Sequence, residues 1–160
     1  MLVNGYISYT ADTCSDWLNG VSPYEYGIGT NAIQPILLGN FANANYSSIG
    51  GGFINNVATG SNVSRVGGGL GNNILGDSTY AYIGGGWANI IANGSMASNI
   101  GGGMSNIVQT SLSSSIVGGQ ANQIQAGSYN GILGGITNII TGASYSAIIN
   151  GLNNRVLAGH

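Results

Sequence analysis

One short phrase recurs eight times along this chain: an apolar residue, a glycine-rich segment, and an asparagine six positions after the apolar residue. Repetition on this scale is typical of a solenoid, in which each turn of the chain stacks on the turn before it. The repeat therefore indicates the fold class before local propensities are considered. The eight copies are Leu37–Asn43, Ile49–Asn55, Val66–Asn72, Ile83–Asn89, Ile100–Asn106, Ile116–Asn122, Ile132–Asn138 and Ile148–Asn154.

The spacing of the repeat shortens between Asn106 and Asn122. Successive asparagines lie 12 residues apart at first, then 17 apart three times, then 16 apart three times. Where the period shortens, a bulky residue replaces glycine five positions before the asparagine. We interpret this as a change in which face of the strand is covered. The glycines are Gly50, Gly67, Gly84 and Gly101, and the bulky residues are Val117, Leu133 and Ile149.

Two columns of the repeat are dominated by β-branched residues. They lie six residues before the asparagine and two residues after it, and β-branched side chains pack well on a pleated strand. We expect these columns, stacked in register, to form a narrow apolar core inside the coil. They comprise Leu37, Ile49, Val66, Ile83, Ile100, Ile116, Ile132 and Ile148, and Val57, Ile74, Ile91, Val108, Ile124, Ile140 and Val156.

The asparagine column predicts a structural ladder. Side-chain amides stacked at the strand spacing of ~4.8 Å can donate and accept hydrogen bonds from one turn to the next. Such a ladder satisfies polar groups at a corner and fixes the register of the turns; ligand binding is the alternative role. The predicted ladder residues are Asn43, Asn55, Asn72, Asn89, Asn106, Asn122, Asn138 and Asn154.

Each turn is predicted to contain two short strands, such as Ala81–Ile83, joined by two corners. Glycine and serine at corners such as Gly60–Ser61 suit tight turns. Glycine also interrupts every candidate helical window, at a cost of ~1 kcal/mol each. We therefore predict an all-β fold, a parallel β-solenoid (β-roll) with 16–17-residue turns over residues 35–160. Residues 1–34 are predicted to form an N-terminal cap or a docking segment.

A bulky column two residues before the asparagine predicts self-association. A two-strand coil encloses little core, and small folds without disulfides or metals often depend on oligomerisation. Cys14 is the single cysteine, so an intramolecular disulfide is excluded. The column, which begins at Phe41 and includes Gln120, is either more of the coil interior or a seam between chains, and we favour the seam of a homotrimer. The predicted seam residues are Phe53, Leu70, Trp87, Met104, Ile136 and Leu152.

The scarcity of charge argues against several functions. Charged residues are 4% of the chain, and Arg65 and Arg155 are its two cations, so phosphate-based binding of nucleic acid is not expected. No apolar run approaches the length of a transmembrane helix, so we expect no membrane insertion. We also expect no catalytic site, no cofactor and no metal site. The single histidine is His160, and the four acids are Asp12, Asp16, Glu25 and Asp77.

Aromatic residues and threonines suggest two further functions. Aromatic side chains can serve as platforms for sugars, although packing between turns or chains is the simpler interpretation. Ice binding uses flat ranks of threonine, but the threonines here do not recur in every turn. The aromatic candidates are Tyr80, Tyr82, Trp87, Tyr129 and Tyr145, and the threonines are Thr59, Thr110 and Thr141.

The phrase of apolar residue, Gly-Gly and Asn with Gly-Ser corners resembles the head repeats of trimeric autotransporter adhesins of the YadA type, and related repeats of viral and phage fibre proteins. The similarity covers Leu37 to His160. It implies a trimer of left-handed parallel β-rolls that acts at a surface in attachment.

From this resemblance we expect a structural fibre or spike segment of a virion or phage tail, located at the virion surface and contributing to host attachment. The alternative is the head domain of a bacterial trimeric adhesin at the cell surface. Expected partners are copies of the chain itself, other virion or fibre proteins through residues 1–34, and a host-surface glycan or protein.

Overall fold

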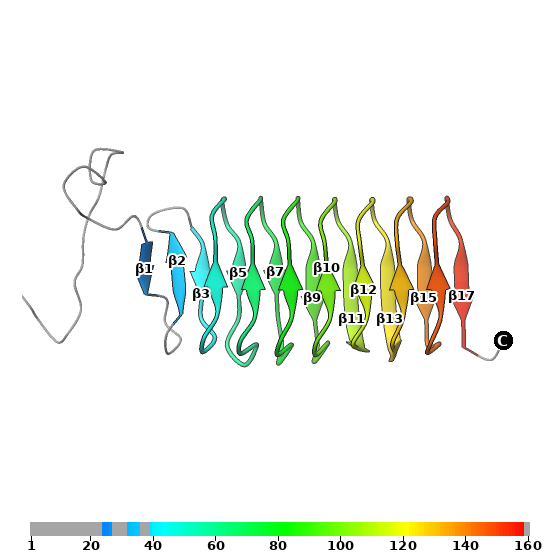
Figure 1. Cartoon of the computed structure of the whole chain (residues 1–160), viewed down its shortest axis with the longest axis horizontal. Coiled ribbons are helices and arrows are strands. Elements are labelled where there is room, and N and C mark those ends of the chain that lie inside the picture. The colour runs from blue at the N-terminus through cyan, green and yellow to red at the C-terminus, as the bar shows by residue number, and fades with distance from the viewer. Residues whose placement is uncertain (1–23, 27–31, 36–38, 159–160) are drawn as a thin grey trace, which may run out of the picture.

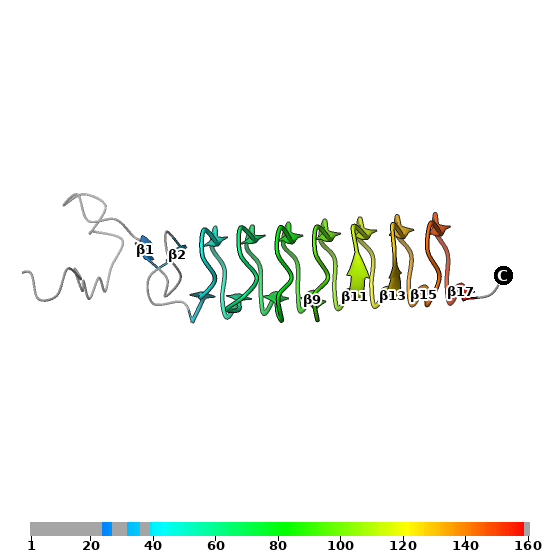
Figure 2. The same ribbon diagram turned by 90° about the horizontal axis from the view of Figure 1, so that it is seen from below.

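The chain forms a straight rod of stacked turns (Figure 1). A computed structural model describes residues 24–26, 32–35 and 39–158. Within these residues about seven successive turns are joined by parallel bridges with offsets of 16 or 17 residues. The predicted all-β parallel solenoid is therefore confirmed. Figure 2, the view turned by 90°, shows the turns following one another along a single axis.

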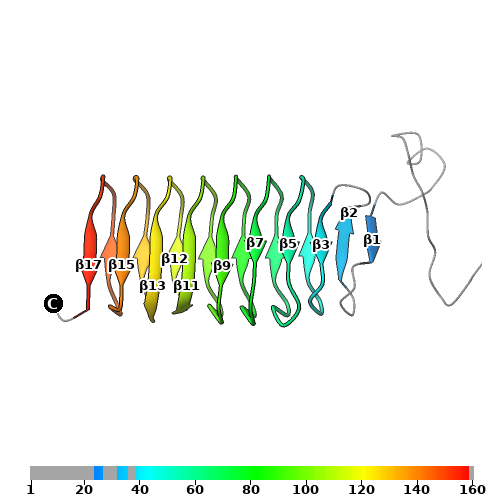
Figure 3. The ribbon, with the colours of Figure 1, turned by 180° about the vertical axis from the view of Figure 1, so that it is seen from behind.

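Two sheets form the walls of the rod (Figures 1 and 3). The first has nine strands in the order β1-β2-β4-β6-β8-β10-β12-β14-β16, and the second has eight in the order β17-β15-β13-β11-β9-β7-β5-β3. The first comprises β1 (Tyr24–Tyr26), β2 (Ile33–Pro35), β4 (Ser48–Ile49), β6 (Arg65–Val66), β8 (Tyr82–Ile83), β10 (Asn99–Ile100), β12 (Ser115–Ile116), β14 (Gly131–Ile132) and β16 (Ala147–Ile148). The second comprises β3 (Phe41–Ala42), β5 (Asn56–Val57), β7 (Asn73–Ile74), β9 (Ile90–Ala92), β11 (Ile107–Leu112), β13 (Gln123–Ser128), β15 (Ile139–Thr141) and β17 (Arg155–Leu157).

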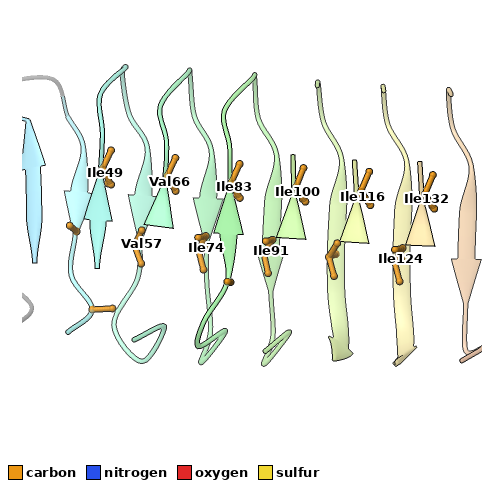
Figure 4. Close-up of a cluster of buried hydrophobic side chains, with 14 of the residues drawn as sticks. Ile49, Val57, Val66, Ile74, Ile83, Ile91, Ile100, Ile116, Ile124 and Ile132 are labelled. Atoms are coloured by element: carbon orange, nitrogen blue, oxygen red, sulfur yellow. The ribbon is translucent and has the colours of Figure 1, made fainter. Parts of the chain in front are cut away.

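The apolar core lies between the two sheets, and β4 to β16 each supply one fully or largely buried β-branched residue to it (Figure 4). In the first sheet Ile83 pairs with Ile100, and in the second Ile74 pairs with Ile91. All four side chains are fully buried, as are most members of the two predicted core columns. Because alternate residues of a strand face opposite sides, each two-residue strand supplies one residue to the core and one to the surface. Leu37 lies outside the described residues.

The shortening of the period occurs on the side of the turn opposite the glycines. Ile90 and Asn99 are nine residues apart, whereas their partners in the next turn, Ile107 and Ser115, are eight apart. The glycine-containing arc keeps its length, since Asn99–Ile107 and Ser115–Gln123 both span eight steps. The missing residue therefore belongs to the serine-containing corner. The replacement of glycine by Val117 is a separate change, and it leaves that side chain exposed.

The N-terminal end departs from parallel stacking. β1 pairs with β2 in antiparallel register, while β2 pairs with β4 in parallel through Ile33 and Ser48. β2 therefore belongs to the solenoid sheet and straddles the predicted domain boundary at residue 34. Most of the segment predicted as a cap or docking segment, residues 1–23 and 27–31, lies outside the described residues.

The middle and third residues of each glycine triplet lie in different environments. Gly86, the third of its triplet, has a φ of +91°, and an added Cβ would lie 2.1 Å from the carbonyl oxygen of Gly103 in the next turn. A Cβ added at Gly85, the middle residue, would have the carbonyl oxygen of Gly68 as its nearest neighbour, at 3.8 Å. The third position is thus required to be glycine both for its backbone conformation and for the close approach of two turns. It is glycine at 52, 69, 86, 103, 119, 135 and 151.

We predict that Gly86→Ala lowers the free energy of unfolding by more than about 2 kcal/mol, because a left-handed backbone costs alanine ~1–2 kcal/mol and the new Cβ separates two turns. Gly85→Ala is the matched control, with an expected change of less than about 1 kcal/mol. Denaturant and thermal unfolding followed by circular dichroism measure both variants. Equal losses in the two variants would contradict the assignment of the close contact to Gly86.

Candidate functional site

The asparagine side chains form a buried ladder at the corner that precedes each strand of the second sheet. The main-chain N–H of Asn89 donates to Oδ1 of Asn72 at 3.0 Å, and Nδ2 of Asn89 lies 3.1 Å from the same oxygen. Nδ2 also donates to the carbonyl oxygens of Gly85 and Gly103, each at 3.0 Å. One side chain therefore connects three successive turns. The same four contacts occur at Asn55, Asn72, Asn106 and Asn122.

The C-terminal rungs keep most of these contacts. Asn138 donates to Asn122, Gly134 and Gly151, and Asn154 donates to Asn138 and Asn150. Seven of the eight predicted ladder residues therefore lie in one continuous column, with their amides hydrogen-bonded from turn to turn.

Within the described residues the first rung is Asn40, and the prediction of Asn43 in this position is wrong. Oδ1 of Asn40 accepts from the main-chain N–H of Asn55 at 3.0 Å, and Gly39 before it has the left-handed backbone that precedes each rung. Asn43 instead continues the strand, donating its N–H to the carbonyl of Val57, and its Oδ1 is buried without a hydrogen-bond partner. The repeat that begins at Leu37 was aligned three residues too far along the chain. The reason is that Asn43, like the later rungs, has an apolar residue six positions before it.

Two columns of buried serines stabilise the opposite corner, and sequence reasoning missed them. Oγ of Ser61 accepts the N–H of Ser78 at 3.1 Å, and Oγ of Ser78 accepts the N–H of Ser95 at 3.3 Å. Three residues further along the chain, Oγ of Ser98 accepts the N–H of Ser114 at 3.2 Å. The sequence feature that could have revealed these columns is a pair of serines three residues apart. It recurs as Ser61/Ser64, Ser95/Ser98 and Ser111/Ser114.

The predicted seam residues lie on the outside of the coil. Together with Gln120 they form a chain of parallel bridges from Phe53 to Leu152, and Trp87 is 55% exposed. The interpretation of this column as additional coil interior is therefore wrong. Phe41 does not belong to it, because Phe41 pairs with Asn56 of β5. We call the exposed column the apolar stripe; its members are Phe53, Leu70, Trp87, Met104, Gln120, Ile136 and Leu152.

A second set of exposed aromatic residues lies at the serine corner. The rings of Tyr129 and Tyr145 stack with centroids 5.0 Å apart and planes 11° from parallel. Tyr80 lies at the equivalent corner three turns before Tyr129, with its N–H donated to the previous turn as in both stacked tyrosines. Tyr82 is on β8 and faces outward from the first sheet. These tyrosines therefore occupy two different surfaces, both separate from the apolar stripe.

The three threonines do not form a rank. Thr141 pairs with Gln125 and Leu157 in the neighbouring turns, so its column contains no adjacent threonine. Thr59 and Thr110 are 51 residues apart, which corresponds to three 17-residue turns, and glycine and asparagine occupy the turns between them. No two of these three threonines are neighbours in adjacent turns.

We predict that Asn89→Ala lowers the free energy of unfolding by at least about 3 kcal/mol. The substitution removes the acceptor of the buried N–H and Nδ2 of Asn106, and it removes the donor to the carbonyls of Gly85 and Gly103. A buried polar group that is left unpaired costs ~1–3 kcal/mol. Asn73→Ala is the matched control on the outer face of β7, where Nδ2 makes one hydrogen bond to the carbonyl of Gly71. Urea unfolding of both variants is the measurement, and a loss at Asn73 as large as that at Asn89 would contradict the special role of the ladder.

Comparisons of the chain with protein-family models and with curated proteins found no match. Among the described residues no three histidine, cysteine or acidic side chains come together as a metal site. The described part of the chain also contains no helix of the length and apolarity needed to span a membrane. The apolar stripe and the exposed tyrosines are two surfaces of the described residues that a partner could contact.

Proposed function

We propose that this protein is a structural segment of a fibre or spike of a virion or phage tail, assembled as a homotrimer of left-handed coils and contributing to attachment at a host surface. The observation that carries the proposal is the apolar stripe along the outside of a straight, stacked rod. The stripe is the surface on which copies of the chain meet.

The size and continuity of the stripe favour burial in an assembly. Monomeric soluble proteins rarely expose contiguous apolar patches larger than a few hundred Å². Here exposed apolar side chains follow one another through Phe53, Leu70 and Trp87 and again at Ile136 and Leu152. Burial of such side chains stabilises an interface by ~25 cal/mol per Å² of apolar area removed from water.

The regularity of the rod favours a symmetric assembly of parallel chains. Equivalent stripe residues lie in consecutive turns, so chains aligned around a common axis place identical residues at the same height. Closed cyclic symmetry satisfies every copy of a repeated surface. Gln120 is the one polar member and none is charged, so assembly along the stripe buries no stripe charge.

The exposed tyrosines support the attachment part of the proposal. Tyr145 is 81% exposed and stacks on Tyr129 at the serine corner, away from the apolar stripe. Aromatic rings with a hydroxyl group contact partners that are partly apolar and partly hydrated, which includes sugars and protein surfaces. In a trimer formed through the stripe, these rings stay available for a host-surface glycan or protein.

We predict that the parent protein is a trimer of 16.1 kDa chains and that Trp87→Asp weakens assembly by at least about tenfold in dissociation constant. Removal of a buried aromatic anchor costs on the order of 2 kcal/mol or more at an interface. Light scattering across a dilution series measures the mass of each species.

Tyr82→Asp is the control, because Tyr82 is also an exposed aromatic residue but lies on the first sheet. It is expected to retain the parent mass. Circular dichroism establishes that both variants keep the coil. A monomeric parent, or equal dissociation of the two variants, would contradict assembly through the stripe.

A further inference from the structure

Three Asn-Gly pairs occur in the described part of the chain, and their geometries differ. They are Asn93–Gly94, Asn130–Gly131 and Asn150–Gly151. In such a pair the main-chain nitrogen of glycine can attack the side-chain carbonyl carbon of asparagine, because glycine has no Cβ to obstruct the approach. The reaction rate depends on how close the folded chain holds the two atoms.

The Asn150–Gly151 pair is held close to this reactive arrangement. The N–H of Gly151 donates to Oδ1 of Asn150 at 2.7 Å, which brings the nitrogen next to the carbon bonded to that oxygen. The side chain of Asn150 is exposed, so water reaches it and ammonia can leave. Asn150 occupies the middle position of the triplet, which is glycine in the six preceding turns and has open space around it.

The Asn130–Gly131 pair is locked in an unreactive arrangement. Asn130 is 3% exposed, its Oδ1 accepts the N–H of Ser146 at 3.0 Å, and its Nδ2 donates to the carbonyl of Ala143 at 2.7 Å. The N–H of Gly131 donates to the carbonyl of Ser146 at 2.9 Å. Attack by the glycine nitrogen would require all three hydrogen bonds to break, each within the stacked corner.

The Asn93–Gly94 pair is exposed, but its nitrogen is directed elsewhere. The N–H of Gly94 donates to the carbonyl of Gly76 in the previous turn at 2.5 Å. This bond holds the N–H of Gly94 on a main-chain carbonyl of the neighbouring turn, and no hydrogen bond joins it to the side chain of Asn93 as one joins Gly151 to Asn150. Exposure alone therefore does not place Asn93 in the same arrangement as Asn150.

We propose that Asn150 is a site of spontaneous backbone-assisted deamidation in the folded protein. The nitrogen of Gly151 loses its proton and bonds to Cγ of Asn150, and the Cγ–Nδ2 bond breaks as Nδ2 leaves with protons as ammonia. The five-membered imide then adds one water molecule. Opening at Cγ yields aspartate, and opening at the main-chain carbonyl yields isoaspartate, so the step needs no oxidant, reductant or metal.

The reaction alters the last rung of the asparagine ladder. Nδ2 of Asn154 donates to the main-chain carbonyl of Asn150 at 3.2 Å. Isoaspartate routes the main chain through the side chain of residue 150 and displaces that carbonyl. Both products also add a negative charge to a chain whose net charge is −2. The modification therefore loosens the C-terminal turn while the inner rungs remain hydrogen-bonded.

The test is a time course of the intact protein in mildly alkaline buffer, followed by proteolysis and mass spectrometry of the three Asn-Gly peptides. The chain has no lysine and two arginines, so a protease that cleaves after aromatic residues and leucine gives the useful peptides. Labelling by an isoaspartyl methyltransferase identifies the isoaspartate product. We expect Asn150 to react at least about tenfold faster than Asn130, and faster than Asn93.

Two controls separate geometry from intrinsic reactivity. In denaturant the three pairs are expected to react at similar rates, because the folded contacts are gone. Asn150→Gly restores the residue used in the other turns and is expected to abolish ammonia release at this site without loss of the fold. The proposal is overturned if Asn93 or Asn130 reacts first in the folded protein, or if folding fails to accelerate Asn150 relative to the denatured chain.

Discussion

The buried side chain of asparagine at one corner of every turn determines how this rod is built. Its Oδ1 accepts the N–H of the asparagine in the next turn, and its Nδ2 donates to carbonyls in its own turn and in the following one. An apolar core alone tolerates sliding of β-branched columns, since every column residue is nearly the same. The ladder removes that freedom, because a slip by one residue leaves a buried amide unpaired at several turns.

The other features of the turn follow from this contact. The carbonyl that receives Nδ2 from the previous turn belongs to the third glycine, which explains why that residue has a left-handed backbone and no room for a Cβ. The serine columns supply side-chain acceptors at the opposite corner. The serine corner is one residue shorter from β11 onward, whereas the asparagine corner keeps its length. The period thus changes without interrupting either sheet.

The sequence predicted the features that recur in every turn and misjudged those that depend on local context. The core columns and the inner ladder residues repeat with a constant residue type, so their roles were readable from spacing. Asn43 was misassigned because two asparagines lie three residues apart and only the fold distinguishes Asn40 as the rung. The serine columns alternate with alanine and asparagine, as at Ala81 and Asn130, which hid them among ordinary corner residues. The exposure of the apolar stripe required the direction of each side chain, which periodicity alone does not give.

The account depends most directly on hydrogen bonds from main chain to asparagine side chain. Amide hydrogen exchange of the native protein measures them one by one. The N–H groups of Asn72, Asn89 and Asn106 are expected to exchange as slowly as those of the paired core strands, although their acceptors are side-chain atoms. The N–H of Met96, which donates within its own exposed corner to Gly94, provides the fast reference. Exchange of the three asparagine amides at the rate of Met96 would contradict the ladder as the interaction that holds the turns in register.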